Sequence, residues 1–130
     1  MNKIFISLFF MVFMAAGIAS HAADDPSIQG KPRDGSQTAM TNHINSNTFD
    51  GKYVIYDAVT GKLLKLDFKK LHAGLVKKGD FYVSCADFAD TEGNKYDLDF
   101  LVGEKNDDYF VVQALVHKVN TDKRKYHIED

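Results

Sequence analysis

The stretch "SCADFADTEGNKYDLDF" (residues 84–100) decides the fold. In its second half, Leu98 and Phe100 alternate with Asp97 and Asp99. Such alternation predicts a β-strand with one face buried and the other in water. The acidic, glycine-containing segment between the two halves is typical of a turn. The stretch therefore predicts an antiparallel β-hairpin.

The register of this hairpin determines the surroundings of the only cysteine in the chain. A two-residue turn at residues 92–93 would pair Cys85 with Phe100, and the thiol would then point into an apolar layer. Asp97 and Asp99 would point outward on the other face. A buried thiol of this kind behaves as a small apolar side chain with little reactivity. A redox-sensing thiol and an intermolecular disulfide are the alternatives.

Strand signals separated by turns continue on both sides of the hairpin. Residues 51–68 read as a hairpin, and residues 109–119 and 125–130 read as two further strands. Residues 68–79 carry apolar side chains at helical spacing and predict one short helix. The expected fold class is mainly β, with α+β as the alternative. It is an antiparallel meander of about six strands, in a curled sheet or partial barrel, with one short helix.

Residues 1–22 have the layout of a secretory signal peptide. Lys3 precedes an apolar run at residues 4–18, and Ser-His-Ala at residues 20–22 supplies small side chains before a cleavage site. The run is short for a membrane anchor, which needs about 20 residues. We therefore expect an exported protein, periplasmic or secreted, with no membrane span after cleavage.

Composition divides the remaining chain into a leader and one domain. Residues 23–48 contain both prolines and no apolar period, which predicts a flexible leader, with an arm packed on the domain as the alternative. Residues 49–130 predict a single antiparallel β domain, because a chain of this length supports one modest core. The formal net charge of −2 argues against nucleic-acid binding, which requires a concentrated basic face.

Two histidines near the C-terminus form the candidate metal site. If residues 121–123 form a three-residue loop, His117 and His127 face each other across two strands, with Cβ atoms about 5 Å apart. Two imidazoles at that separation could share one transition-metal ion. No HxH or HExxH spacing supports this site, and ordinary surface histidines are the alternative. No other cofactor is expected.

The sequence contains no catalytic motif of the kind that binds phosphate or presents a nucleophile. GxSxG, GxxxxGK[ST] and GxGxxG segments are all missing. A small hydrolase would need a pocket lined by convergent acids, or by Cys85 together with His72. The sequence therefore predicts no catalytic residue, and it favours binding over enzyme activity.

The favoured function is that of an exported, non-catalytic binding or interaction module. Its partner would be a protein or a small ligand, bound through a sheet face or an edge strand such as residues 125–130. Asp97, Asp99 and Tyr126 are the residues expected on that interaction surface. Metal handling through the two C-terminal histidines, a small hydrolase and self-association into an oligomer are the alternatives.

Overall fold

The computed structural model describes residues 23–126 of the chain. In this part the elements are α1 (Lys31–Ser46), β1 (Thr48–Phe49), β2 (Lys52–Asp57), β3 (Lys62–Leu71), β4 (Val76–Lys78), β5 (Phe81–Ala89), β6 (Lys95–Lys105), β7 (Asp108–Val119) and β8 (Asp122–Lys123). The predicted signal peptide and His127 lie outside the described residues. Between residues 23 and 126 no helix combines the length and the apolar character needed to cross a membrane.

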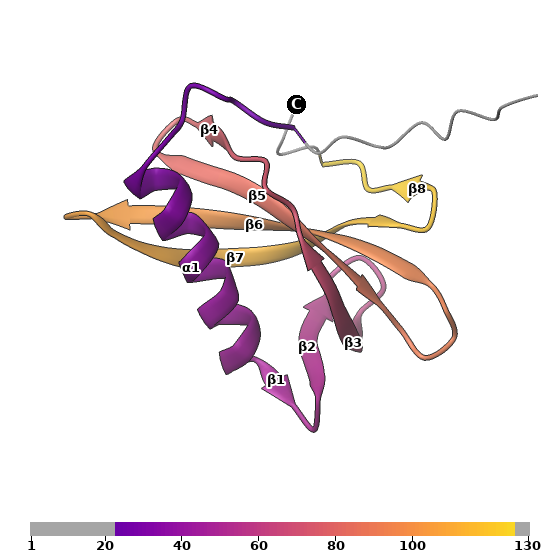
Figure 1. Ribbon diagram of the computed structural model, residues 1–130. Coiled ribbons are helices and arrows are strands. Elements are labelled where there is room, and N and C mark those ends of the chain that lie inside the picture. Colours follow the sequence, from indigo (N-terminus) through magenta and orange to yellow (C-terminus); the bar gives the residue numbers. More distant parts are fainter. Residues whose placement is uncertain (1–22, 127–130) are drawn as a thin grey trace, which may run out of the picture.

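The strands form one eight-stranded antiparallel sheet, shown in Figure 1. Its order is β1-β2-β3-β5-β6-β7-β8, and the short strand β4 pairs with β5 beside this path. Most neighbours in the sheet are also consecutive in the sequence, as in a meander. The sheet is not closed, and the predicted fold class, mainly antiparallel β with one helix, is confirmed.

Residues 31–46, predicted to lie in a flexible leader, instead form α1. Gly30 precedes the helix with a φ of 68°, a conformation that glycine adopts readily, and Pro32 occupies the first turn, where its missing N–H costs little. The helix buries Ser36, Ala39, Met40 and Ile44. The leader prediction is therefore corrected. Three apolar residues and one serine do not make a recognisable helical stripe in the sequence, and packing on the sheet stabilises the helix.

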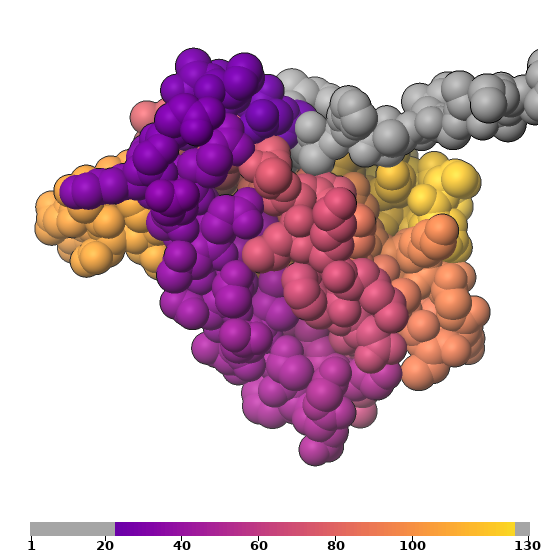
Figure 2. Space-filling model, in the orientation of Figure 1, coloured from indigo at the N-terminus to yellow at the C-terminus, as the bar shows by residue number. Residues whose placement is uncertain are grey.

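α1 crosses one face of the sheet and packs mainly against β7 (Figure 1). At the closest approach, a Cβ atom on Gly35 would lie 2.1 Å from Cδ2 of Tyr109. Glycine inside a helix costs about 1 kcal/mol relative to alanine, and the need for close contact explains its presence here. The helix and the strands β2 and β3 form a continuous surface on this side of the molecule (Figure 2).

The segment before the helix is also attached to the domain. Oδ1 of Asp24 accepts hydrogen bonds from the backbone N–H of Leu75 at 3.0 Å and from the Arg33 guanidinium at 2.9 Å. The hydrogen bond from Leu75 is the main reason why the pKa of Asp24 is lowered, and the bond from Arg33 adds to it. Arg33 also donates to the carbonyl of Ala73 at 2.5 Å. The structure thus shows the packed arm rather than the flexible leader.

The short helix predicted over residues 68–79 is not observed. The end of β3 and the whole of β4 occupy this range. The register shifts between Phe68 and Lys70, so that Lys69 is the extra residue of a β-bulge. A bulge interrupts the two-residue period of a strand. The apolar residues on either side then fall three apart, a spacing that resembles one turn of a helix.

The β5–β6 hairpin forms, but its loop is longer than predicted. Residues 90–94 make the loop, since the last pair joins Ala89 and Lys95. Oδ1 of Asp90 accepts the backbone N–H groups of Glu92 and Asn94, each at 2.9 Å. The Asn94 side chain donates to Oδ2 and is the largest cause of the lowered pKa of Asp90. These hydrogen bonds from within the loop to the Asp90 carboxylate favour a five-residue loop over a two-residue turn.

The longer loop changes the register by one residue and so reverses the surroundings of the cysteine. Cys85 is paired with Asp99, while Phe100 is paired with Ser84. The predicted burial of Cys85, Leu98 and Phe100 is confirmed, because none of them is more than 1% exposed. The predicted solvent exposure of Asp99 is wrong, since Asp99 is fully buried.

The central strands therefore have an apolar face and a polar face. The apolar face packs against α1 and includes Phe88, Leu98, Phe100 and Val102. Residues that alternate with these along β5 and β6 project to the opposite side. On that polar face lie Cys85, Asp87, Asp97 and Asp99.

Candidate metal centre

Two neighbouring strands direct polar side chains to one patch of the polar face. Cys85 and Asp87 lie two residues apart on β5, and Asp97 of β6 is paired directly with Asp87. Residues two apart on a strand, and residues paired across strands, project to the same side. The register therefore brings a thiol and two carboxylates together.

The bulge at Lys69 adds a histidine to this patch. With the register before the bulge, His72 would have come level with Ser84. With the register after it, His72 comes level with Cys85, and its backbone N–H donates to the Cys85 carbonyl at 2.9 Å. Bulges commonly re-aim a side chain in this way, and they are frequent beside functional sites.

His72 lies between the thiol and one of the carboxylates. Its Nδ1 is 2.7 Å from Sγ of Cys85, and its Nε2 is 2.9 Å from Oδ2 of Asp87. When Nε2 carries the ring proton and donates it to Asp87, the lone pair of Nδ1 is directed toward the sulfur. One histidine nitrogen, Sγ of Cys85 and one carboxylate oxygen of Asp97 all lie within 4.8 Å of one another.

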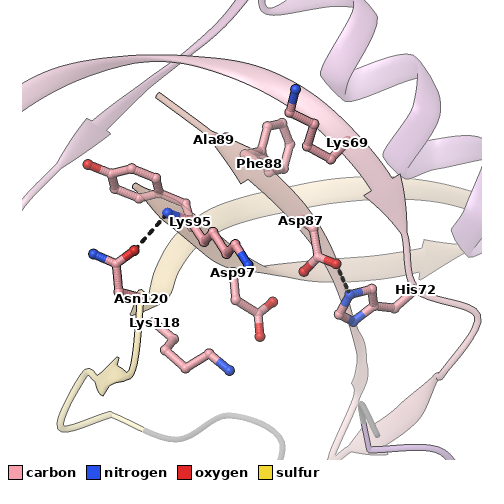
Figure 3. A pocket seen from close by; sticks show the side chains of 10 residues that line it. Lys69, His72, Asp87, Phe88, Ala89, Lys95, Asp97, Lys118 and Asn120 are labelled. Carbon is pink, nitrogen blue, oxygen red and sulfur yellow. Dashed lines mark hydrogen bonds and ion pairs between the residues drawn. The ribbon is translucent and has the colours of Figure 1, made fainter. Parts of the chain in front are cut away.

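A pocket of about 490 Å³ opens beside this group (Figure 3). His72, Asp87 and Asp97 line it, together with Lys95 and Lys118 among others. Cys85 is only 1% exposed and does not line the pocket. The group therefore has a buried sulfur at one end and an imidazole and a carboxylate that reach the pocket wall.

A second polar pair is buried in the same face. His117 is the extra residue of a bulge in β7, where the pair Asp97–Lys118 is followed by the pair Leu98–Val116. Its Nδ1 lies 3.2 Å from Oδ1 of Asp99, and the side chains are 8% and 0% exposed. Neither of these residues is available as a surface group.

The loop on which the predicted histidine pair depends is shorter than expected. β7 and β8 are joined by a two-residue turn at residues 120–121. The backbone N–H of Arg124 donates to the carbonyl of His117 at 2.7 Å. Arg124 therefore lies opposite His117, in the position that the predicted three-residue loop would give to His127. The three-residue loop is therefore wrong. The metal site formed by the two histidines stays a prediction, because His127 lies outside the described residues.

The three residues predicted for an interaction surface have different environments. Asp97 lines the pocket and is partly buried. Asp99 is in the interior, as described above. Tyr126 is partly buried, and its hydroxyl donates to the carbonyl of Val116. Only Asp97 belongs to the candidate metal centre.

Sequence patterns do not reveal this centre. In the sequence, Cys85 and His72 come together only under the hydrolase alternative, and Asp87 is there only one of the candidate acids. The available signal was Asp90, whose capping ability indicates the longer loop and hence the correct face for the acids. The bulge at Lys69 leaves no recognisable pattern.

The chain matches no protein-family profile, no curated protein and no solved structure. The fold and the site define only a class. It is a mainly antiparallel β protein with one helix, in which nitrogen, sulfur and oxygen donors gather on the sheet face opposite the helix.

Proposed function

We propose that the chain is an exported, non-catalytic protein that binds a divalent transition-metal ion such as zinc through His72, Cys85 and Asp97. The observation that carries the proposal is the approach of one nitrogen, one sulfur and one oxygen donor to within 4.8 Å of one another. Zinc is bound in proteins by these three donor types. Calcium and magnesium prefer oxygen ligands alone, so the thiol argues against them. Export is proposed from the signal-peptide pattern of residues 1–22.

The distances require a small adjustment. In a tetrahedral zinc site with Zn–S of about 2.3 Å and Zn–N of about 2.0 Å, sulfur and nitrogen lie about 3.5 Å apart. Nδ1 of His72 and Sγ of Cys85 are 2.7 Å apart, and the thiol proton lies between them when Nε2 carries the ring proton. An ion that replaces this proton would need the two atoms to separate by about 1 Å. Metal binding would therefore release a proton from the thiol.

Asp87 supports this role without being a ligand. Histidines that bind a metal through one nitrogen usually donate the other ring N–H to a carboxylate or a carbonyl group. That bond fixes the tautomer and the orientation of the ring. The contact between Nε2 of His72 and Asp87 has this form, at 2.9 Å.

Cys85, His72 and Asp87 also follow the order of nucleophile, base and carboxylate found in cysteine-dependent hydrolases. Two observations favour the metal. Cys85 is 1% exposed, so a substrate carbonyl group has no access to Sγ. The nearby carboxylate of Asp97 opposes a free thiolate by charge repulsion, whereas a cation held by both groups is stabilised by both charges.

Titration of the purified protein with zinc and with cobalt(II) tests the proposal. We expect one equivalent to bind with release of a proton, and the cobalt complex to show thiolate-to-metal charge-transfer absorption. Cys85→Ser should abolish that absorption, and His72→Ala should weaken binding strongly. Asp50→Asn removes an exposed carboxylate from the turn between β1 and β2, and it should change neither the affinity nor the cobalt spectrum.

His117→Ala distinguishes the two candidate metal sites. The proposed centre predicts that this variant, if folded by circular dichroism, keeps the affinity and the cobalt spectrum of the wild type. Loss of metal binding in His117→Ala with retention in His72→Ala would instead support the site formed with His127. Absence of binding by the wild type would refute both.

A further inference from the structure

The proposed ion would have one coordination position that the chain does not fill. A zinc ion held by three protein ligands commonly keeps its fourth position for water or another small ligand. Cys85 lies beneath the surface, whereas His72 and Asp97 reach the pocket wall. The remaining position would therefore face the pocket.

Two lysines flank the carboxylate at this position. Lys95 precedes Asp97 by two residues on β6, and Lys118 of β7 is paired with Asp97, so all three share one face. Figure 3 shows the two lysine side chains on either side of Asp97. Among residues 23–126, neither lysine takes part in an ion pair with another side chain. Their charges are available to a ligand in the pocket.

A third lysine lines the pocket but has a different orientation. Lys69 is the bulge residue of β3 and lies beyond Phe88, with its ammonium group directed away from His72 and Asp87 (Figure 3). It carries the same charge in the same pocket without pointing at the candidate metal centre. Lys69 therefore offers a matched control.

We infer that the pocket binds a phosphate group, inorganic or esterified, with one oxygen on the metal ion and others accepting hydrogen bonds from Lys95 and Lys118. The inference rests on the proposed metal centre. A phosphate can direct a separate oxygen to each of three cationic partners that lie in different directions, whereas a carboxylate has only two oxygens. The volume of about 490 Å³ exceeds the roughly 30 Å³ of one water many times, so the group fits.

The test uses full-length protein loaded with one equivalent of cobalt(II), titrated with inorganic phosphate, phenyl phosphate and acetate. We expect both phosphates to shift the cobalt spectrum saturably, and acetate to bind at least 10-fold more weakly. Lys95→Gln and Lys118→Gln should each raise the Kd for phosphate about 10-fold, because a hydrogen bond to a charged group contributes about 1.5 kcal/mol. Lys69→Gln should leave the Kd unchanged. Comparison of the two phosphates tells whether the pocket favours the free or the esterified form, and binding of either supports the inference.

Failure of this inference is distinguishable from failure of the metal proposal. If cobalt does not bind, the proposed function falls, and this inference falls with it. If cobalt binds as expected but phosphate has no effect, only the inference is overturned. It is also overturned if metal-free protein binds phosphate equally well, if acetate binds as tightly, or if Lys69→Gln weakens binding as much as the other two substitutions.

Discussion

Nε2 of His72 lies 2.9 Å from Oδ2 of Asp87, on the side of the ring opposite the cysteine sulfur. Asp87 therefore controls which nitrogen of the ring carries the proton. If His72 is a metal ligand, this carboxylate raises the affinity without touching the ion.

We predict that Asp87→Ala lowers the affinity for zinc about 10-fold or more, the usual effect of losing such a partner. Competition with a chromophoric chelator measures the change, and circular dichroism checks the fold. Asp80→Ala removes an exposed carboxylate just before β5 and serves as the control. Equal affinities of Asp87→Ala and the wild type would mean that Asp87 does not orient a metal ligand.

The second prediction concerns the glycine inside α1. Gly35→Ala raises helix propensity by about 1 kcal/mol, but the new methyl group would lie 2.1 Å from Cδ2 and 2.7 Å from Cγ of Tyr109. These are the inner atoms of the ring, so rotation of the tyrosine tip does not relieve the contact. We expect a net loss of about 1–3 kcal/mol in the free energy of unfolding, measured with urea. In a Tyr109→Ala background the same substitution should be neutral or stabilising, and an equal loss in both backgrounds would contradict the packing explanation.

Alternation along the chain was sufficient to predict the sheet. Leu98 and Phe100 alternate with acids, and both are buried, because the two-residue period of a strand does not depend on the partner strand. The loop between β5 and β6 determines which residues of β5 lie on the same face as Leu98 and Phe100. A change of one residue in the register moves Cys85 and Asp87 to the opposite face.

The helix and the candidate site could not be predicted for a common reason. Both depend on contacts between distant residues. The helix is stabilised by packing of Met40 and Ile44 on a sheet that the local sequence does not show. The site requires a bulge at Lys69 that shifts His72 from the level of Ser84 to that of Cys85. A bulge of one residue requires no particular residue type, so the local sequence does not reveal it.

The third prediction concerns a buried ion pair between the end of β2 and the segment after β8. The Arg124 guanidinium lies 2.8 Å from Oδ2 of Asp57, and the two side chains are 15% and 3% exposed. Arg124→Met should cost roughly 3 kcal/mol in the free energy of unfolding, because it leaves a buried carboxylate without its cation. Urea unfolding measures this change. The double variant Asp57→Asn with Arg124→Met should recover part of the loss, and a single variant as stable as the wild type would show that the pair contributes nothing.

The last prediction concerns pH. His43 lies in the last turn of α1, with Nε2 3.1 Å from Oη of Tyr53, and burial lowers the pKa of His43 below its usual 6.5. As the pH falls below about 6.5, the unfolded chain takes up a proton at this residue while the folded protein does not. The unfolded state then binds more protons, so the free energy of unfolding decreases until the pH reaches the lowered pKa of the folded state, and it levels off below that value.

Urea unfolding at a series of pH values from about 8 to about 5 measures this dependence, and His43→Gln isolates it. The variant keeps a polar group near Tyr53 but has no titrating ring, so its stability should fall less over this interval than that of the wild type. Because the other titrating groups are the same in both proteins, the difference between the two curves belongs to His43. Parallel curves would mean that the imidazole titrates alike in the folded and the unfolded chain, and that its burial beside Phe100, at a ring-centroid distance of 5.9 Å, does not disfavour its charged form.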